Sequence, residues 1–371
     1  MWYAGDMLTS FPVHRTYKYR LYRSDRVKHL VNAIDIAGII WNHGLALSRR
    51  YYRRYGKGLS FNRLQKHIAR LRSKTVRFGY WRKLGSQAVQ DVIQRLEKAY
   101  KRFFKGQGGF PRFKKVKKYP SFTLKQAGWK LLDGNKVQLL GRNYKFVKSR
   151  DIHGTIKTVT VKRDSMGRLW ICFSVVMTVF VPEATTSQIG GFDFGLKTFL
   201  TNAEGRTIES PQFFKQSQRQ IAALNRELSR KQDGSNNRQR AKYRLAKAHN
   251  DIKNRRRDWF FKLAHHLCDC YETMYFETLN LCGMQQLWGR KVNDLAFAEF
   301  LKVLQHVAQN RGCKVFAINQ WEATTQICSG CGHKQKLTLR ERIFKCGCGL
   351  ELDRDHNAAR NILRVGASTH D

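Results

Sequence analysis

The chain has 371 residues, of which 70 are Lys or Arg and 27 are Asp or Glu, so its formal net charge is +43 at pH 7. Such a charge indicates a polyanionic partner, and nucleic acid is the first candidate, because neutralising its phosphates releases condensed counterions. The composition disfavours a membrane protein, since basic residues are spread along the whole chain and no run of roughly eighteen apolar residues occurs. The first residues lack the segments of a secretory signal, so we expect a cytoplasmic, nucleoid-associated protein.

The N-terminal part of the chain begins with a predicted strand and continues as a basic helical module. In residues 16–21, Tyr and Leu alternate with Lys and Arg, the period-2 pattern of a strand with one charged face. Helical signals dominate from residue 27 to about residue 105. The clearest helix has Ser86 as its predicted N-cap, followed by an apolar face that extends to Phe103.

Residues 108–184 are predicted to form a small β-domain. Their first part, up to residue 120, is rich in Gly, Lys and Arg without helical periodicity, which indicates a boundary loop. Two β-rich runs, 156–161 and 169–176, are separated by turn-forming residues and predict a hairpin. We expect this domain to form a barrel that takes in the first strand.

A different architecture begins at residue 189, where strand and helix alternate as in an α/β layer fold. Short buried strands are predicted to stand between long helices in this part. The predicted helices are 216–228, 240–267 and 294–311, and the predicted strands are 189–192, 274–276 and 313–318.

Three acidic residues stand at strand ends or at a helix start. Asp193 and Glu277 follow short apolar strands, and Asp355 comes just before a helical run. Hydrolysis of a phosphodiester by two divalent ions about 4 Å apart requires several carboxylates that converge on one point. Hard oxygen ligands favour Mg²⁺ or Mn²⁺ over zinc. For each acid alone, a helix cap or a surface ion pair is the better interpretation, and only the three together favour a metal site.

Four cysteines form two close pairs near the C-terminus, each followed by a glycine. The pairs are Cys328 with Cys331 and Cys346 with Cys348. Thiolate pairs on tight turns suit tetrahedral zinc, and four protein ligands make the site structural. Two alternatives stay open: His333 as a substitute ligand, and a redox dithiol for the first pair.

Three motifs in this order resemble TnpB, the transposon-encoded RNA-guided nucleases related to type V CRISPR effectors. They are 191–197 (GFDFGLK), 276–280 (FETLN), and the paired cysteines followed by 352–359 (LDRDHNAA). Helix 87–104 with 110–114 (FPRFK) extends the resemblance to the N-terminal half. The chain departs from the family pattern at Phe192, at Thr278 and in the short spacing of the second cysteine pair, but none of these removes a metal ligand.

The resemblance implies a multidomain α/β and β protein. It would contain a wedge-like β-barrel domain, a helical recognition lobe and an RNase H-like RuvC domain with an inserted four-cysteine zinc finger. Read onto this chain, the domains are 1–23 (wedge strand), 24–107 (recognition lobe), 108–184 (wedge β-domain) and 185–371 (RuvC), with the zinc finger at about 322–351.

The function implied by the resemblance is RNA-guided, Mg²⁺-dependent (or Mn²⁺-dependent) cleavage of DNA in a prokaryote. Asp193, Glu277 and Asp355 would be the catalytic metal ligands, with Asp353 in support and with structural Zn²⁺ on the cysteines. The implied partners are a guide RNA from the transposon end, held by one protein chain, and a target DNA chosen by base pairing and by a short motif that the protein reads. The alternatives are an RNA-guided repressor without cleavage and an RNA-independent transposase.

Two basic groups are candidate phosphate contacts, beside which Phe113 or Tyr119 could stack on a base. For each residue alone, a solvated surface cation is an equally good interpretation. The candidates are Arg70, Arg72, Lys74, Arg77, Arg112, Lys114, Lys115, Lys117 and Lys118.

Overall fold

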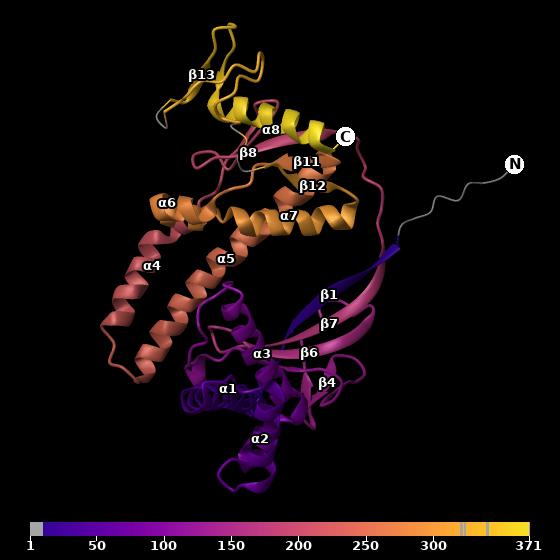
Figure 1. Ribbon diagram of the computed structural model, residues 1–371, viewed down its shortest axis with the longest axis vertical. Coiled ribbons are helices and arrows are strands. Elements are labelled where there is room, and N and C mark those ends of the chain that lie inside the picture. Colours follow the sequence, from indigo (N-terminus) through magenta and orange to yellow (C-terminus); the bar gives the residue numbers. More distant parts are fainter. Residues whose placement is uncertain (1–9, 320–321, 323, 339–340, 371) are drawn as a thin grey trace, which may run out of the picture. The chain divides into compact units, whose positions relative to one another are not determined.

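The computed structural model describes residues 10–319, 322, 324–338 and 341–370. These residues divide into an N-terminal unit, 10–179, and a C-terminal unit that begins at residue 180 (Figure 1). Residues 1–9 of the predicted wedge segment and residues 323 and 339–340 of the predicted zinc finger lie outside the described residues. The finer division into wedge strand, recognition lobe and wedge domain stays a prediction.

The N-terminal unit combines two antiparallel sheets with three α-helices. Strands β1, β7, β6 and β2 form one sheet in that order, and β3, β4 and β5 form the other. Its elements are β1 (Ser10–Arg20), α1 (Val27–Tyr55), α2 (Phe61–Lys74), η1 (Gly79–Leu84), α3 (Ser86–Phe104), η2 (Val116–Lys118), β2 (Ser121–Leu124), β3 (Trp129–Leu131), β4 (Lys136–Leu139), β5 (Arg142–Lys145), β6 (Thr155–Arg163) and β7 (Leu169–Phe180).

The predicted hairpin is confirmed as the antiparallel pair β6 and β7. Asp164 closes its turn, because one carboxylate oxygen accepts hydrogen bonds from the backbone N–H of Met166 and of Arg168, both at 2.9 Å. The predicted N-cap of α3 is wrong by one residue. The helix begins at Ser86 itself, and its N-cap is Gly85, whose φ of +78° suits glycine better than residues with a Cβ.

The helices and strands of the N-terminal unit share one hydrophobic core, which includes Tyr19 of β1, Trp81 of η1, and Phe122 and Phe173 of the main sheet. The predicted helical module and β-domain are therefore packed together rather than built around separate cores. The expected barrel is not confirmed, because β1 and β2 are the outer strands of their sheet.

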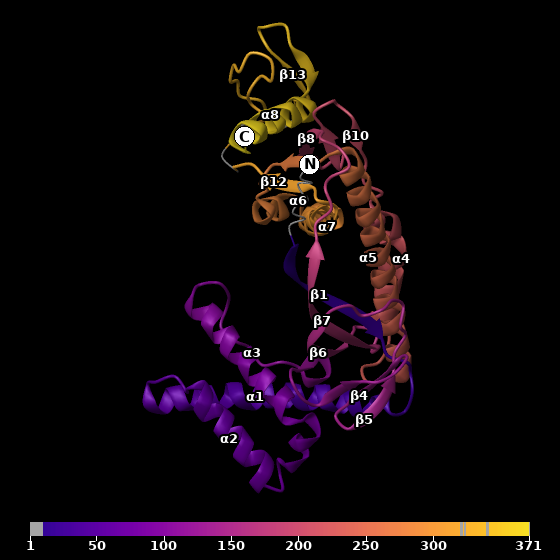
Figure 2. The same ribbon diagram turned by 90° about the vertical axis from the view of Figure 1, so that its right-hand side faces the viewer.

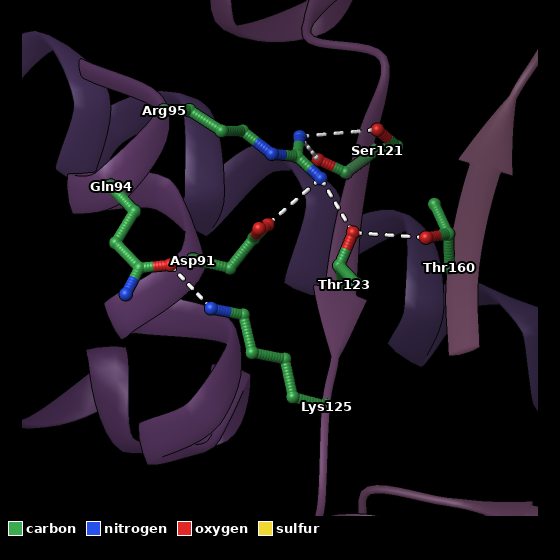
Figure 3. Close-up of polar contacts among 7 residues, drawn as sticks. All are labelled: Asp91, Gln94, Arg95, Ser121, Thr123, Lys125 and Thr160. Carbon is green, nitrogen blue, oxygen red and sulfur yellow. Dashed lines mark hydrogen bonds and ion pairs between the residues drawn. The ribbon is translucent and has the colours of Figure 1, made fainter. Parts of the chain in front are cut away.

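Arg95 ties α3 to the sheet through polar contacts at the edge of this core (Figure 3). Its guanidinium pairs with Asp91 at 2.8 Å on the same helix. The same group donates to the carbonyl oxygen of Ser121 at 2.9 Å and to the hydroxyl of Thr123 at 2.8 Å, both on β2. The buried carboxylate of Asp91 is thus paired with a cation, and the guanidinium of Arg95 also satisfies a main-chain carbonyl oxygen of the edge strand β2.

Among the described helices, α1 is the one that is long and apolar enough to cross a membrane by length and composition. Of its most apolar window, 61% is buried inside the protein. Its residues Leu30, Ile34 and Ile40 belong to the core of the N-terminal unit. The apolar character of α1 is thus that of a core helix.

The C-terminal unit is built on one mixed sheet in the order β10-β9-β8-β11-β12. Strands β8, β11 and β12 are parallel, and β9 is antiparallel to both of its neighbours. Numbered along this unit, the strand order is 3-2-1-4-5. Its elements are β8 (Ile189–Phe194), β9 (Leu200–Asn202), β10 (Thr207–Ile208), α4 (Phe213–Ser229), α5 (Asn236–Cys270), β11 (Thr273–Phe276), α6 (Leu281–Leu295), α7 (Phe297–Arg311), β12 (Lys314–Ala317), β13 (Ile343–Lys345), β14 (Glu351–Asp353) and α8 (Arg354–His370).

The two sides of this sheet carry different helices (Figures 1 and 2). Phe192, Phe194 and Phe276 share a core with residues of α5 and α7. Tyr275 packs instead with Ile362 of α8. The predicted strands and the helices α4, α5 and α7 are confirmed, but α6 was not predicted.

Candidate active site

Asp193 and Glu277 lie side by side at the ends of two parallel strands. Phe192 of β8 pairs in register with Phe276 of β11, so the residues that follow them are neighbours. Because side chains alternate along a strand and the flanking phenylalanines enter the α5 and α7 core, Asp193 projects to the other face, which α8 covers.

Asp355 reaches the same point from the first turn of α8. The helix can lie directly on β8 because residue 191 is glycine: a Cβ there would lie 2.5 Å from the carbonyl oxygen of Ala359 and 2.5 Å from the amide nitrogen of Leu363. Gly191 on β8 thus lets an acid from the far end of the chain meet Asp193.

We expect Gly191→Ala to lower the free energy of unfolding by about 1–3 kcal/mol, because α8 must move away from β8 to admit the methyl group. Thermal or guanidinium denaturation measures this loss. Gly58→Ala is the matched control, because a Cβ at Gly58 would meet no atom within 4 Å. If the two variants lose the same stability, the close packing of α8 on β8 is wrong.

Burial among like charges raises the pKa of two of these carboxyl groups, Asp193 and Glu277. Burial raises the pKa of Asp193 well above its usual value, and the charges of Glu277 and Asp355 add to this effect. Burial also raises the pKa of Glu277 to about 7, with a further contribution from Asp355 and an opposing hydrogen bond from Asp193. Arg354 partly offsets this repulsion, since its Nε lies 3.7 Å from Asp355. Close, buried oxygen ligands with an excess of negative charge fit hard divalent cations.

Asp353 supports the start of α8. Its Oδ1 accepts hydrogen bonds from the backbone N–H of Asp355 at 2.8 Å and of His356 at 3.3 Å. These bonds satisfy amides that have no partner within the first turn of a helix. This arrangement agrees with the supporting role that the motif implies for Asp353.

The four predicted cysteines converge on one point, with all four Sγ atoms within 4.8 Å of one another. The distances are 3.7 Å from Cys328 to Cys348 and 3.5 Å from Cys331 to Cys346. Zn–S bonds of about 2.3 Å in a tetrahedron place sulfur atoms about 3.8 Å apart, so the set fits zinc. His333 is exposed and is not part of this cluster.

A glycine closes the turn at each cysteine pair. Gly332 and Gly349 have φ of +78° and +90°, and their N–H groups donate to the carbonyl oxygens of Cys328 and Cys346, both at 3.0 Å. Burial acts to raise the pKa of the Cys328 thiol, but hydrogen bonds from the backbone N–H of Cys331 and Gly330 outweigh it and lower that pKa to about 6. A thiol of this kind is readily deprotonated to a metal ligand.

Two buried asparagines of α8, to which we assigned no role from the sequence, hold the segment that leads to the first cysteine pair. Asn357 donates to the carbonyl oxygen of Ile327 at 2.7 Å and accepts from the N–H of Ser329 at 2.9 Å. Asn361 donates to Thr324 at 2.8 Å and to Ile327 at 2.6 Å. The cysteine cluster is therefore fastened to the helix whose first turn carries Asp355. In the sequence, the available signal for these two residues was an asparagine at a position where the helical pattern predicts an apolar side chain.

The candidate nucleic-acid contacts form two groups in the N-terminal unit. In the first, Arg70, Lys74 and Arg77 are exposed at and after the end of α2, and Arg72 is half-buried. In the second, all the basic residues of 112–118 are exposed. Tyr119 is buried in the core, so the suggestion that it stacks on a base is wrong.

Comparison with known proteins shows which family this chain belongs to. Residues 171–287 match the family model described as "Probable transposase" (OrfB_IS605), and residues 297–362 match the "Cas12f1-like, TNB domain". A mimivirus protein named "TnpB-like protein L79" is 29% identical over 57% of this chain and 43% of its own length. InsQ of Escherichia coli (strain K12) is 30% identical over 76% of this chain and 74% of its own length. The chain belongs to the TnpB family.

A further relative comes from Streptomyces pristinaespiralis and is 29% identical over 95% of this chain and 90% of its own length. It and InsQ both carry the name "Putative RNA-guided DNA endonuclease". Among solved structures, the protein of a Cas12f1–sgRNA–target DNA complex matches at a TM-score of 0.37 and 16% identity, over 95% of this chain and 99% of that one.

Proposed function

We propose that this TnpB-family protein is an RNA-guided DNA endonuclease in which Asp193, Glu277 and Asp355 hold Mg²⁺ or Mn²⁺. The observation that supports this most directly is the meeting of three acids, from residues 193, 277 and 355 of a strongly basic chain, at one end of the mixed sheet. Asp193 and Glu277 share a hydrogen bond with each other, and Asp355 has an ion-pair contact with Arg354.

The three carboxylates would hold divalent ions that stabilise the negative charge of a phosphodiester as it is hydrolysed. Asp193 is the buried anchor, at 5% exposure, while Glu277 and Asp355 are partly exposed. Without cations the three carboxylates would repel the phosphate that is to be hydrolysed, so bound cations would favour its placement at this point. Zn²⁺ on the four cysteines would be structural.

Guidance by RNA is supported by the family and by the charge of the chain. The names of InsQ and of the Streptomyces relative describe RNA-guided DNA cleavage. In this proposal one chain holds a guide RNA from the transposon end, base pairing selects the DNA, and the protein reads a short adjacent motif. The basic residues bind phosphates irrespective of sequence.

Sequencing the nucleic acid that co-purifies with the protein tests the proposal. We expect a discrete RNA species, and a complex that cuts DNA complementary to its guide segment when Mg²⁺ is added but not in EDTA. A discrete RNA without cleavage would indicate an RNA-guided repressor. Absence of RNA, with DNA strand transfer, would indicate the RNA-independent transposase that the name of the family model suggests.

A further inference from the structure

The segment Pro111–Lys118, which we call the basic strap, connects α3 to β2 and follows one side of α1. It carries five basic residues among eight, and its main chain is held by side chains of that helix. The indole N–H of Trp41 donates to the carbonyl oxygen of Arg112 at 3.1 Å. Arg49 donates to the carbonyl oxygen of Pro111 at 3.2 Å. The strap is the boundary loop predicted from its composition, with one short 3-10 turn, and these hydrogen bonds hold it against α1.

Asn42 fixes the middle of the basic strap. Its amide nitrogen donates to the carbonyl oxygen of Lys114 at 2.8 Å, and its amide oxygen accepts from the N–H of the same residue at 2.8 Å. One side chain thus satisfies both polar groups of a single backbone residue, as a neighbouring β-strand would. This bond pair sets the orientation of the strap without using any charge.

A buried carboxylate holds the C-terminal end of the basic strap. Asp35 of α1, 8% exposed, pairs with Lys117 at 2.6 Å and with Arg163 of β6 at 3.0 Å. Arg163 also donates to the carbonyl oxygens of Val116 at 3.2 Å and Tyr119 at 3.1 Å. Lys117 therefore serves the structure of the strap, and the exposed side chains of Arg112, Lys115 and Lys118 are the better candidates for ligand contact.

Phe113 stands among these cations with 52% of its surface exposed. The guanidinium of Arg49 lies 4.9 Å from the centre of its ring and 5.1 Å from that of Phe110, so the ring is held in place. A fixed aromatic ring among phosphate-binding cations is the combination that binds unpaired nucleotides, because bases stack on the ring while phosphates meet the cations. Bases in duplex DNA are stacked on one another and do not offer this contact.

We propose that the basic strap is a preformed binding site for single-stranded RNA. Phosphates bind its exposed cations, an unpaired base stacks on Phe113, and Asn42 is the positioning residue that presents both. This proposal rests on the proposed function, since it makes the guide RNA the occupant. It goes beyond that function in naming the contact surface, the stacking residue and the element that orders it.

Binding of a labelled single-stranded oligouridine and of a duplex DNA of equal length to the full chain, freed of its own nucleic acid, tests this inference. We expect Phe113→Ala to weaken oligouridine binding about tenfold with little effect on the duplex. Phe113→Trp should restore it, and Phe180→Ala, which removes another exposed phenylalanine, should change neither. Equal weakening of both probes would show that Phe113 does not distinguish single-stranded RNA from duplex DNA and would overturn the inference.

Asn42→Ala removes no charge, yet we expect it to weaken oligouridine binding about fivefold and to lower the salt dependence of the affinity, because fewer phosphates are contacted at once. Asn32→Ala is the matched control, an exposed asparagine on the same helix. Identical affinities for the two asparagine variants would overturn the role of Asn42. If the strap variants bind oligouridine normally while the wild type still cuts DNA complementary to its RNA, this inference is wrong and the proposed function is unaffected. If the wild type binds no RNA, the proposed function fails.

Discussion

Replacing Asp193 by Asn is expected to abolish DNA cleavage while RNA binding and target binding persist. The substitution keeps the size of the side chain but removes the most buried of the three negative charges. We expect the cleavage rate to fall by more than about 100-fold, because mutating a residue that only orients a metal ligand already lowers metal affinity or activity by about 10- to 100-fold. Single-turnover cleavage and binding of the RNA-loaded complex, measured in parallel, check this separation.

The same variant has an expected effect on stability that does not depend on activity. In EDTA at neutral pH, Asp193→Asn should be more stable than wild type, because the carboxylate it replaces is buried beside two like charges. Mg²⁺ at about 100 times its dissociation constant should stabilise wild type by about 2.7 kcal/mol and should stabilise the variant much less. Equal responses of the two proteins to Mg²⁺ would exclude Asp193 as a ligand.

Asp353→Asn is the matched control for these measurements. Asparagine caps helices as well as aspartate does, so a residue whose task is to cap α8 should tolerate the change. We therefore expect near-normal cleavage and a near-normal response to Mg²⁺. A loss comparable to that of Asp193→Asn would instead make Asp353 a metal ligand.

Loss of the zinc site should impair cleavage more than RNA binding. We expect Cys328→Ser with Cys331→Ser to remove one zinc ion per chain, measured by elemental analysis, and with it about 10–16 kcal/mol of metal-binding free energy. The segment ordered by Asn357 and Asn361 would then lose its anchor next to Asp355. Cys270→Ser, outside the cluster, should keep its zinc and its activity. Equal loss of cleavage and RNA binding would contradict this role of the zinc site.

Sequence patterns predicted six of the fourteen strands in the described part of the chain and several of the long helices, because alternation and helical periodicity are local. The hairpin of β6 and β7 and the helices α4 and α5 are examples. Helix α6 was not predicted between Glu277 and residue 294, and the N-cap of α3 was predicted one residue late. The basic strap was correctly predicted to be a loop, but its order could not be predicted, because its hydrogen-bond partners lie on α1, 62 to 82 residues away in the chain.

The sequence by itself determined which residues could form the two metal sites. The cysteine pairs with their turn glycines carry their geometry within a short segment, so four cysteines that converge were predictable from spacing alone. The three acids are different, because each alone is an ordinary cap or ion-pair residue. Only the register of β8 with β11, and the glycine on β8 that admits α8, bring Asp193, Glu277 and Asp355 together. The candidate active site of the C-terminal unit thus depends on long-range packing, whereas the cysteine cluster depends mainly on local sequence.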